Sequence, residues 1–167
     1  MLNIEKDEKY YSIIEDILAN EEFKRLNNIE HHGITRYEHS VRVSYVSYKI
    51  CKLLNLDYID AARAGLLHDF FMSDENRDFK EKFISTFVHP KIAVDNSIRV
   101  FGINGREYDI IRSHMFPFTT SLPKYAESWA VVLADKTIGS YEFLKKFGCK
   151  FSYAANLFII FVLNYLK

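Results

Sequence analysis

The sequence predicts an all-α domain of about six or seven helices. Three observations lead to this fold class. Apolar residues recur every three to four positions along almost the whole chain, which is the period of a helix that faces a core rather than the alternation typical of strands. No linker, repeat or low-complexity tract interrupts this pattern. The chain has 167 residues, 49% of them hydrophobic, and is therefore long enough for one domain with its own core.

The first half of the chain contains three segments with helical periodicity. The first has an apolar face made of Tyr10, Ile13, Ile14, Ile17 and Leu18, and residues 22–26 either continue this helix or form a short second one. Asparagine, glycine and threonine then break the pattern, and residues 37–54 predict a long amphipathic helix. The next helix begins near Asp57 and runs to residue 71. The polar stretch 72–83 that follows predicts a loop.

Three more helices are expected in the second half. Residues 89–102 predict a helix with Pro90 in its first turn, where proline is tolerated, and a terminating glycine. Asn104, with Glu107 three residues later, is typical of a capped helix start, and that helix extends to residue 114. After a loop stiffened by two prolines, residues 124–147 predict a long helix, either continuous or broken at Gly139.

The C-terminal segment 151–166 contains no charged residue. It is shorter than the ~20 apolar residues that a spanning helix needs, and it contains two asparagines, so we do not expect a membrane span. A helix that is apolar all round must be covered. We expect it to be buried in the domain or in a homodimer contact.

Composition narrows the range of partners and compartments. The 22 basic residues equal the 22 acidic ones, so bulk charge does not indicate binding to a nucleic-acid polymer or an anionic membrane. Cys51 and Cys149 lack metal-site or disulfide-ladder spacing, which fits a reducing compartment. The N-terminus is too rich in charged residues for a signal peptide. These features predict a cytoplasmic protein.

Histidine and aspartate recur on the predicted helices in a fixed order. The series is His39, His68 with Asp69, His89, His114 and Asp135, with gaps of 20 to 29 residues that each accommodate a helix and its turn. Because a carboxylate on an apolar helix needs neutralising, the partner is either a basic residue or a divalent cation. Only the cation also explains the accompanying imidazoles. Taken singly, each histidine has a structural interpretation, which we keep for His31 and His32.

This ordered series resembles the HD-domain superfamily of metal-dependent phosphohydrolases. The motifs that match are His39, the pair in LLHDF, and the aspartate in LADK, while His89 and His114 match the extra histidines of its binuclear branch. The resemblance implies one HD-type domain over residues 1–167, with a metal-binding core at about 37–141 and flanking helices. It also implies that His39, His68, Asp69 and Asp135 hold one metal. Asp69 would bridge to a second metal on His89 and His114.

The ligand types also indicate the chemistry. Imidazole with carboxylate suits two ions of Fe, Mn, Zn, Co or Ni better than Mg or Ca. Such ions activate a water to hydroxide that attacks a phosphoester or phosphoanhydride, with His68 and Asp69 at the catalytic centre. Basic residues are needed to orient the phosphates. The candidates, each with solvent exposure as the alternative, are Arg36, Arg112 and Lys136.

The sequence constrains the identity of the substrate less than it constrains the metal ligands. Related proteins often continue the pair as HDIGK, with a lysine that can touch substrate, whereas this chain has Phe70 and Phe71. The resemblance implies a nucleotide or dinucleoside polyphosphate. The aromatic residues Phe116, Phe118 and Trp129 form either a wall for stacking a base or part of the core. Two other functions stay open, a di-iron oxygenase and a non-catalytic nucleotide sensor on the same fold.

Overall fold

The all-α prediction is confirmed by a computed structural model that describes residues 7–31, 34–72 and 79–146. Within these residues the chain forms seven α-helices, one 3-10 helix and one two-stranded antiparallel ladder. The elements are α1 (Glu8–Ala19), α2 (Glu21–Lys24), η2 (Arg25–Asn28), β1 (Glu30–His31), β2 (Ile34–Thr35), α3 (Arg36–Leu53), α4 (Tyr58–Leu67), α5 (Phe79–Phe101), α6 (Gly105–Ser113) and α7 (Ala126–Lys146).

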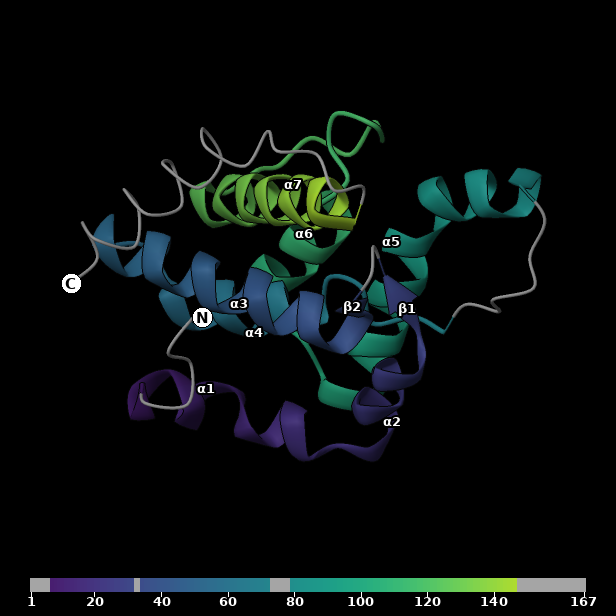
Figure 1. The fold of residues 1–167 in the computed structure, drawn as a ribbon. Helices are drawn as coiled ribbons and strands as arrows, with labels where there is room; N and C mark the ends of the chain where they lie inside the picture. Colours follow the sequence, from purple (N-terminus) through teal and green to yellow (C-terminus); the bar gives the residue numbers. More distant parts are fainter. Residues whose placement is uncertain (1–6, 32–33, 73–78, 147–167) are drawn as a thin grey trace.

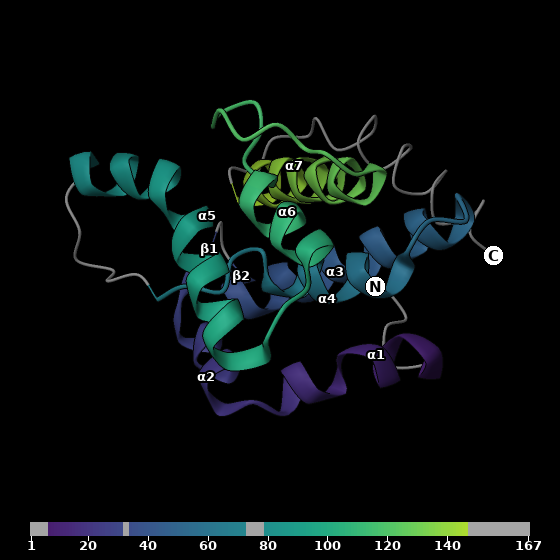
Figure 2. The same cartoon turned by 180° about the vertical axis from the view of Figure 1, so that it is seen from behind.

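The helices are stacked around the pair α3 and α4, which lie against each other in the middle of the molecule. Helices α1 and α2 lie on one side of this pair, and α6 and α7 lie on the other (Figure 1). Seen from behind, α5 stands beside the stack and α6 lies between α5 and α7 (Figure 2). Helices that are distant in the sequence, notably α3 and α7, therefore bring their side chains to one place.

Helix starts follow the capping rules. Thr35 begins α3 with a capping box, in which its side chain accepts from the Glu38 amide and the Glu38 carboxylate accepts from the Thr35 amide. Asn104 and Glu107 form the same arrangement at α6, as the sequence predicted. Asp57 accepts from two amides at the start of α4. These caps fix the register of the helices that carry His39, His68 and His114.

The core lies between α1, α3, α4 and α6. Tyr10, Ile14 and Ile17 of α1 are fully buried against Leu66 and Leu67 of α4 and their neighbours. A short polar chain crosses this core, because the Tyr10 hydroxyl donates to Ser44 Oγ at 2.8 Å and Ser44 Oγ donates to the Ala62 carbonyl at 2.6 Å. Burial of both hydroxyls is thus offset by hydrogen bonds.

Helix α5 differs from the sequence prediction. It begins at Phe79 instead of near residue 89, so part of the expected loop 72–83 is helical and Pro90 lies inside the helix. Charged residues in 79–83 concealed a helical recurrence of phenylalanine at 79, 83 and 87. Both ribbon views show α5 bending along its length, as expected where proline removes one amide hydrogen bond. His89 therefore lies within a bent helix rather than at a helix start.

None of the helices described here is long and apolar enough to cross a membrane. The apolar segment 151–166 lies outside the described residues, so its burial or its role in a homodimer stays a prediction.

Candidate metal centre

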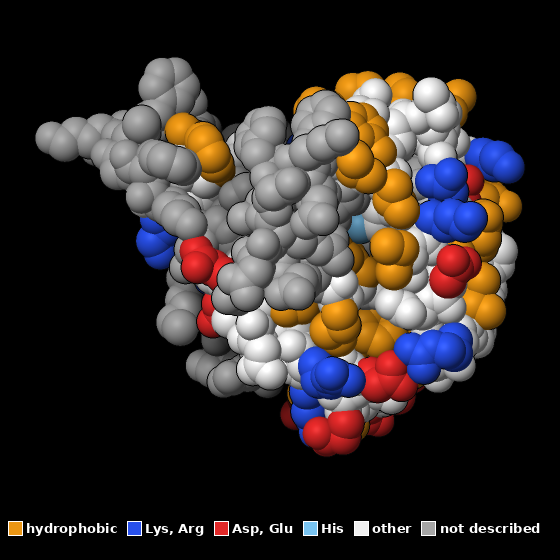
Figure 3. Space-filling model, turned by 90° about the vertical axis from the view of Figure 1, so that its right-hand side faces the viewer, with side chains coloured by type: hydrophobic (Ala, Val, Ile, Leu, Met, Phe, Trp, Pro, Cys, Tyr) orange, Lys and Arg blue, Asp and Glu red, His pale blue; other side chains and the backbone are white. Residues whose placement is uncertain are grey.

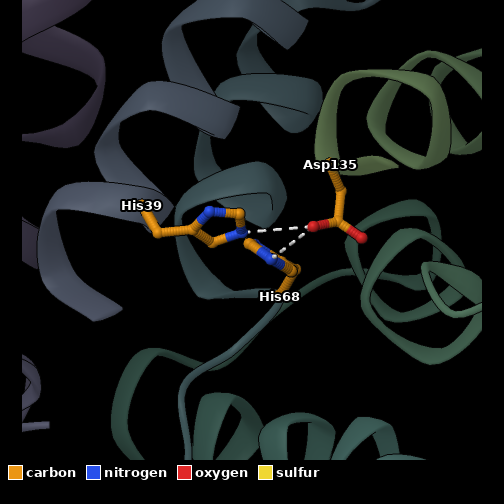
Figure 4. A group of neighbouring side chains, drawn as sticks. All are labelled: His39, His68 and Asp135. Atoms are coloured by element: carbon orange, nitrogen blue, oxygen red, sulfur yellow. Dashed lines mark hydrogen bonds and ion pairs between the residues drawn. The ribbon is translucent and has the colours of Figure 1, made fainter. Parts of the chain in front are cut away.

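Three side chains from α3, the end of α4 and α7 meet in a first donor group. His39 Nε2 lies 3.1 Å from Asp135 Oδ1, and His68 Nε2 lies 3.6 Å from the same oxygen (Figure 4). Both imidazoles are buried, and the Asp135 side chain is 12% exposed. Two ring nitrogens and one carboxylate oxygen therefore point at a common centre.

His68 shows how the sequence places adjacent residues at this centre. Helix α4 ends at Leu67 rather than at the predicted residue 71, so His68 and Asp69 follow its last turn, and both face inward. His68 Nδ1–H donates to the Gly65 carbonyl at 2.8 Å. Its Nε2 is buried and has no hydrogen-bond partner within the described part of the chain. A buried ring nitrogen in this position can serve as a ligand to a cation.

A second donor group adjoins the first. His89 Nε2 lies 3.3 Å and His114 Nε2 3.6 Å from Asp69 Oδ1, and the two nitrogens are 2.9 Å apart. His114 Nδ1–H donates to the Ile111 carbonyl at 2.8 Å, which leaves His114 Nε2 as an acceptor. The other Asp69 oxygen, Oδ2, lies 3.9 Å from His68 Nε2. The two oxygens of Asp69 thus face the two groups.

Burial and neighbouring charges set the protonation of these donors. Burial raises the pKa of Asp69, but His68, His89 and Arg36 outweigh it and hold that pKa well below its usual range. Burial likewise raises the pKa of Asp135, and His39 and His68 bring it well below the usual value. Burial, together with His68 and His89, lowers the pKa of His114 to about 3. Both aspartates are therefore charged and His114 is neutral at pH 7.

The family of the chain follows from a comparison with known protein families. The family model described as "HD domain" matches residues 36–139, which is well over half of the chain. The chain belongs to the HD-domain family. HD domains are metal-dependent phosphohydrolases that bind divalent cations and act on small phosphorylated substrates. Searches of the curated proteins and of the solved structures find no match.

The donors of this HD domain fit a divalent transition metal. His39, His68 and Asp135 form one set whose donor atoms lie within 4.8 Å of one another, and His68, Asp69 and His114 form another. The 2.9 Å between His89 and His114 Nε2 suits two nitrogens that share one cation at ~2.1 Å, since neighbouring ligands are then ~3 Å apart. Without a cation, the buried Nε2 of His68 would face two carboxylates with no hydrogen bond.

Glu142 supports the HD centre and was not foreseen from the sequence. Its Oε2 accepts from His39 Nδ1 at 2.7 Å and its Oε1 accepts from Arg42 at 3.0 Å. Burial lowers the pKa of His39, but hydrogen bonds to Asp135 and Glu142 outweigh it and raise that pKa to about 10. One signal was present, because Glu142 follows Asp135 by two helical turns and therefore shares its face of α7.

The three basic residues predicted to orient substrate phosphates lie in different surroundings. Lys136 is nearest to the solvent side of the centre, where its Nζ donates to Asp135 Oδ2 at 2.8 Å and its side chain is 31% exposed. Arg36 is buried, and its Nη1 donates to the Phe71 carbonyl at 2.6 Å. Arg112 is half-buried and makes no hydrogen bond or ion pair with another residue of the described part of the chain. Among these three residues, Lys136 thus both contacts a donor group and is partly exposed to solvent.

The rim of the centre is partly apolar. In the space-filling view, part of a histidine side chain is visible beside hydrophobic side chains (Figure 3). On the loop after α6, Phe118 is 62% exposed, and Lys136 Nζ lies 5.7 Å from its ring centre. Phe116 meets Trp129 edge to face at 5.3 Å, and Trp129 is 46% exposed. Phe118 and Trp129 are therefore surface residues rather than core.

Proposed function

We propose that this HD domain hydrolyses a phosphoester or phosphoanhydride bond in a small phosphorylated substrate, specifically a nucleotide or dinucleoside polyphosphate. One observation carries the proposal. His68 Nε2 is a buried ring nitrogen that faces the carboxylates of Asp69 and Asp135 without a hydrogen bond to any described residue. A purely structural histidine would have both nitrogens satisfied.

The ligand roles proposed here follow the two donor groups. One cation would be held by His39, His68, Asp69 and Asp135, and a second by His89, His114 and the other oxygen of Asp69. Support comes from Asp69, whose Oδ1 lies 3.3 Å from His89 Nε2 while its Oδ2 lies 3.9 Å from His68 Nε2. A carboxylate in this position suits a bridging ligand.

The chain's own residues perform the remaining tasks. When bound, divalent cations of this kind lower the pKa of coordinated water and neutralise charge on the phosphoryl oxygens. The neutral ring of His114 and the charged carboxylates of Asp69 and Asp135 are already in the protonation states that such ligands need. Lys136, held beside Asp135, supplies a positive charge at the rim that orients a substrate phosphate. Exposed Phe118 offers a flat apolar surface beside Lys136, and Trp129 is a second exposed ring on the same helix as Lys136.

A hydrolysis assay tests the proposal. The purified protein, supplied with Mn²⁺, Fe²⁺ or Co²⁺, is expected to release phosphate or a nucleotide from a panel of nucleotides and dinucleoside polyphosphates. Asp69→Asn should lower kcat at least ~100-fold, because both cations lose a charged ligand. Asp95→Asn on the exposed side of α5 is the matched control and should retain activity. Oxygen consumption without any hydrolysis would instead favour the oxygenase, and binding without turnover the sensor.

A further inference from the structure

Four buried side chains form a closed ring of contacts beside the second donor group. The Arg36 guanidinium lies over the Phe71 ring at 3.9 Å, and Phe71 stacks on His89 with ring centres 4.9 Å apart and planes inclined by 25°. His89 Nε2 lies 3.3 Å from Asp69 Oδ1. Asp69 Oδ2 lies 4.0 Å from Arg36 Nε, which closes the ring.

These contacts join three separate parts of the fold. Arg36 is the first residue of α3, Asp69 and Phe71 follow α4, and His89 lies within α5. Main-chain bonds strengthen the arrangement, since Arg36 Nη1 donates to the Phe71 carbonyl at 2.6 Å and the Phe71 amide donates to the Asp69 carbonyl at 2.7 Å. All four residues are less than 9% exposed, so none of these contacts is weakened by water.

We propose that Arg36 and Phe71 are positioning residues for the second cation. They act through His89 and Asp69 and need not touch the substrate. This inference rests on the proposed function, because it assumes that His89 and Asp69 are ligands. It gives Arg36 a different task from the phosphate binding expected from the sequence.

The physical argument concerns the orientation of the His89 ring. An imidazole can rotate about its side-chain bonds, and a ligand loses affinity when its nitrogen turns away from the cation. Stacking on Phe71 fixes the plane of the His89 ring, and the Arg36 guanidinium that lies over the Phe71 ring fixes Phe71 in turn. A planar, delocalised guanidinium stacks in this way, whereas a lysine ammonium is a compact charge that cannot also reach the Phe71 carbonyl in the same geometry.

The two consecutive phenylalanines provide a matched pair for the test. Phe70 is as buried as Phe71, but it packs against Phe23 and Phe101 at 5.8 Å in the hydrophobic core. Leucine at either position removes one aromatic ring from the interior. Only the change at position 71 removes the ring that contacts His89 and Arg36.

The experiment titrates metal-free protein with Co²⁺ and follows its visible absorption, with bound metal counted by mass spectrometry. Phe71→Leu is expected to weaken the second cation about 10- to 100-fold and to leave the first unchanged. Phe70→Leu should bind both cations as the parent protein does, at the expense of a lower melting temperature. Arg36→Lys, which keeps the charge and the buried aromatic rings, should reproduce the Phe71→Leu loss. The double variant should lose little more than either single variant, since both residues act through one stack.

Three results would overturn the inference: parent-like affinity for both cations in Phe71→Leu and Arg36→Lys, an equal loss in Phe70→Leu, or a parent protein that binds one cation. Circular dichroism of each variant separates lost binding from failure to fold, and Arg36→Lys carries the test should Phe71→Leu not fold.

Because the titration needs no substrate, it is independent of the hydrolysis assay. An inactive protein with the expected titrations would refute the proposed function alone, and an active protein with unchanged titrations would refute the positioning role alone.

Discussion

In three histidines of the candidate centre, His39, His68 and His114, a hydrogen bond from Nδ1 fixes the ring. Their Nε2 atoms face the donor groups. His68 and His114 donate Nδ1–H to backbone carbonyls three residues earlier, at Gly65 and Ile111. His39 differs, because its Nδ1 donates to the buried carboxylate of Glu142. A carboxylate behind a ligating imidazole raises the basicity of the ring and strengthens its bond to a cation.

This difference makes a prediction for Glu142→Gln. Glutamine keeps an oxygen that accepts from His39 Nδ1, but it loses the negative charge, so cation affinity should fall about 10-fold or more. Glu127→Gln is the matched control, because Glu127 is also buried on α7 but accepts from the Asp57 amide at 2.9 Å. Competition with a fluorescent chelator measures both variants. Equal affinities for Glu142→Gln and the parent protein would show that Glu142 has no supporting role.

The sequence identified the residues that converge but not the residues that support them. His39, His68, Asp69 and Asp135 were recognised from their order in the chain, and the structure brings them together. Glu142 and the stacking of Arg36 on Phe71 were missed. Such contacts depend on which helix faces meet, and residues 36 and 71, or 39 and 142, belong to helices whose relative placement no local pattern encodes.

At the scale of helices, the close approach of α3 and α4 places His39 beside His68. A Cβ atom on Gly65 would lie 3.1 Å from the Ser44 Cα, which is backbone and cannot move aside alone. Gly65→Ala should therefore push the helices apart and lower the free energy of unfolding by about 1–3 kcal/mol. Urea denaturation measures the change.

Gly105 offers a control for the same substitution. A Cβ on Gly105, the first residue of α6, would meet nothing within 4 Å. Gly105→Ala should raise the free energy of unfolding by about 0.4–1 kcal/mol, since alanine restricts the unfolded chain. If Gly65→Ala were as stable as the parent protein, close packing of α3 on α4 would not be what positions His39 and His68.

One ion pair between α1 and α4 stabilises the fold to an extent that depends on pH. Arg63 donates from both terminal nitrogens to the two oxygens of Asp16, at 2.7 and 2.8 Å. This hydrogen bonding outweighs burial and lowers the pKa of Asp16 from its ordinary value of 3.8. The stabilisation is therefore present above the unfolded pKa and disappears as the pH falls through the lowered pKa. Half of the Asp16 side chain is exposed, which limits the contribution to about 1 kcal/mol.

Asp16→Asn should accordingly lower the free energy of unfolding by up to about 1 kcal/mol at neutral pH and by less at pH ~2. Urea denaturation at both pH values checks this. Glu15→Gln, at an exposed neighbouring position, should change stability at neither pH. A pH-independent difference between Asp16→Asn and the parent protein would exclude the ion pair as its cause.

Most helices were predictable from periodicity and caps, and α5 shows why one was not. The capping box of Asn104 and Glu107 marked α6 in the sequence, and the structure has it. The start of α5 lacked such a mark, and Pro90 was interpreted as a first-turn proline. Proline is compatible with a helix start and with a bend inside a helix, and tertiary packing decides between them.

For the whole molecule, we propose that residues 1–167 form one HD-type domain, with the metal-binding core at about 37–141 and helices on both sides. Helices α1 and α7, from opposite ends of the described chain, both pack on the central pair α3 and α4. Calorimetry of the full chain should therefore show one transition with equal calorimetric and van't Hoff enthalpies. Two separate transitions would show that a flanking part folds independently.

The central claim is that four histidines and two aspartates converge to hold divalent cations. Anomalous diffraction from crystals grown with Mn²⁺ or Co²⁺ tests it most directly. The account predicts two peaks per chain at ~3.5–4 Å separation, one among His39, His68 and Asp135 and the other among Asp69, His89 and His114. A fully loaded crystal with no anomalous peak at these side chains would contradict it.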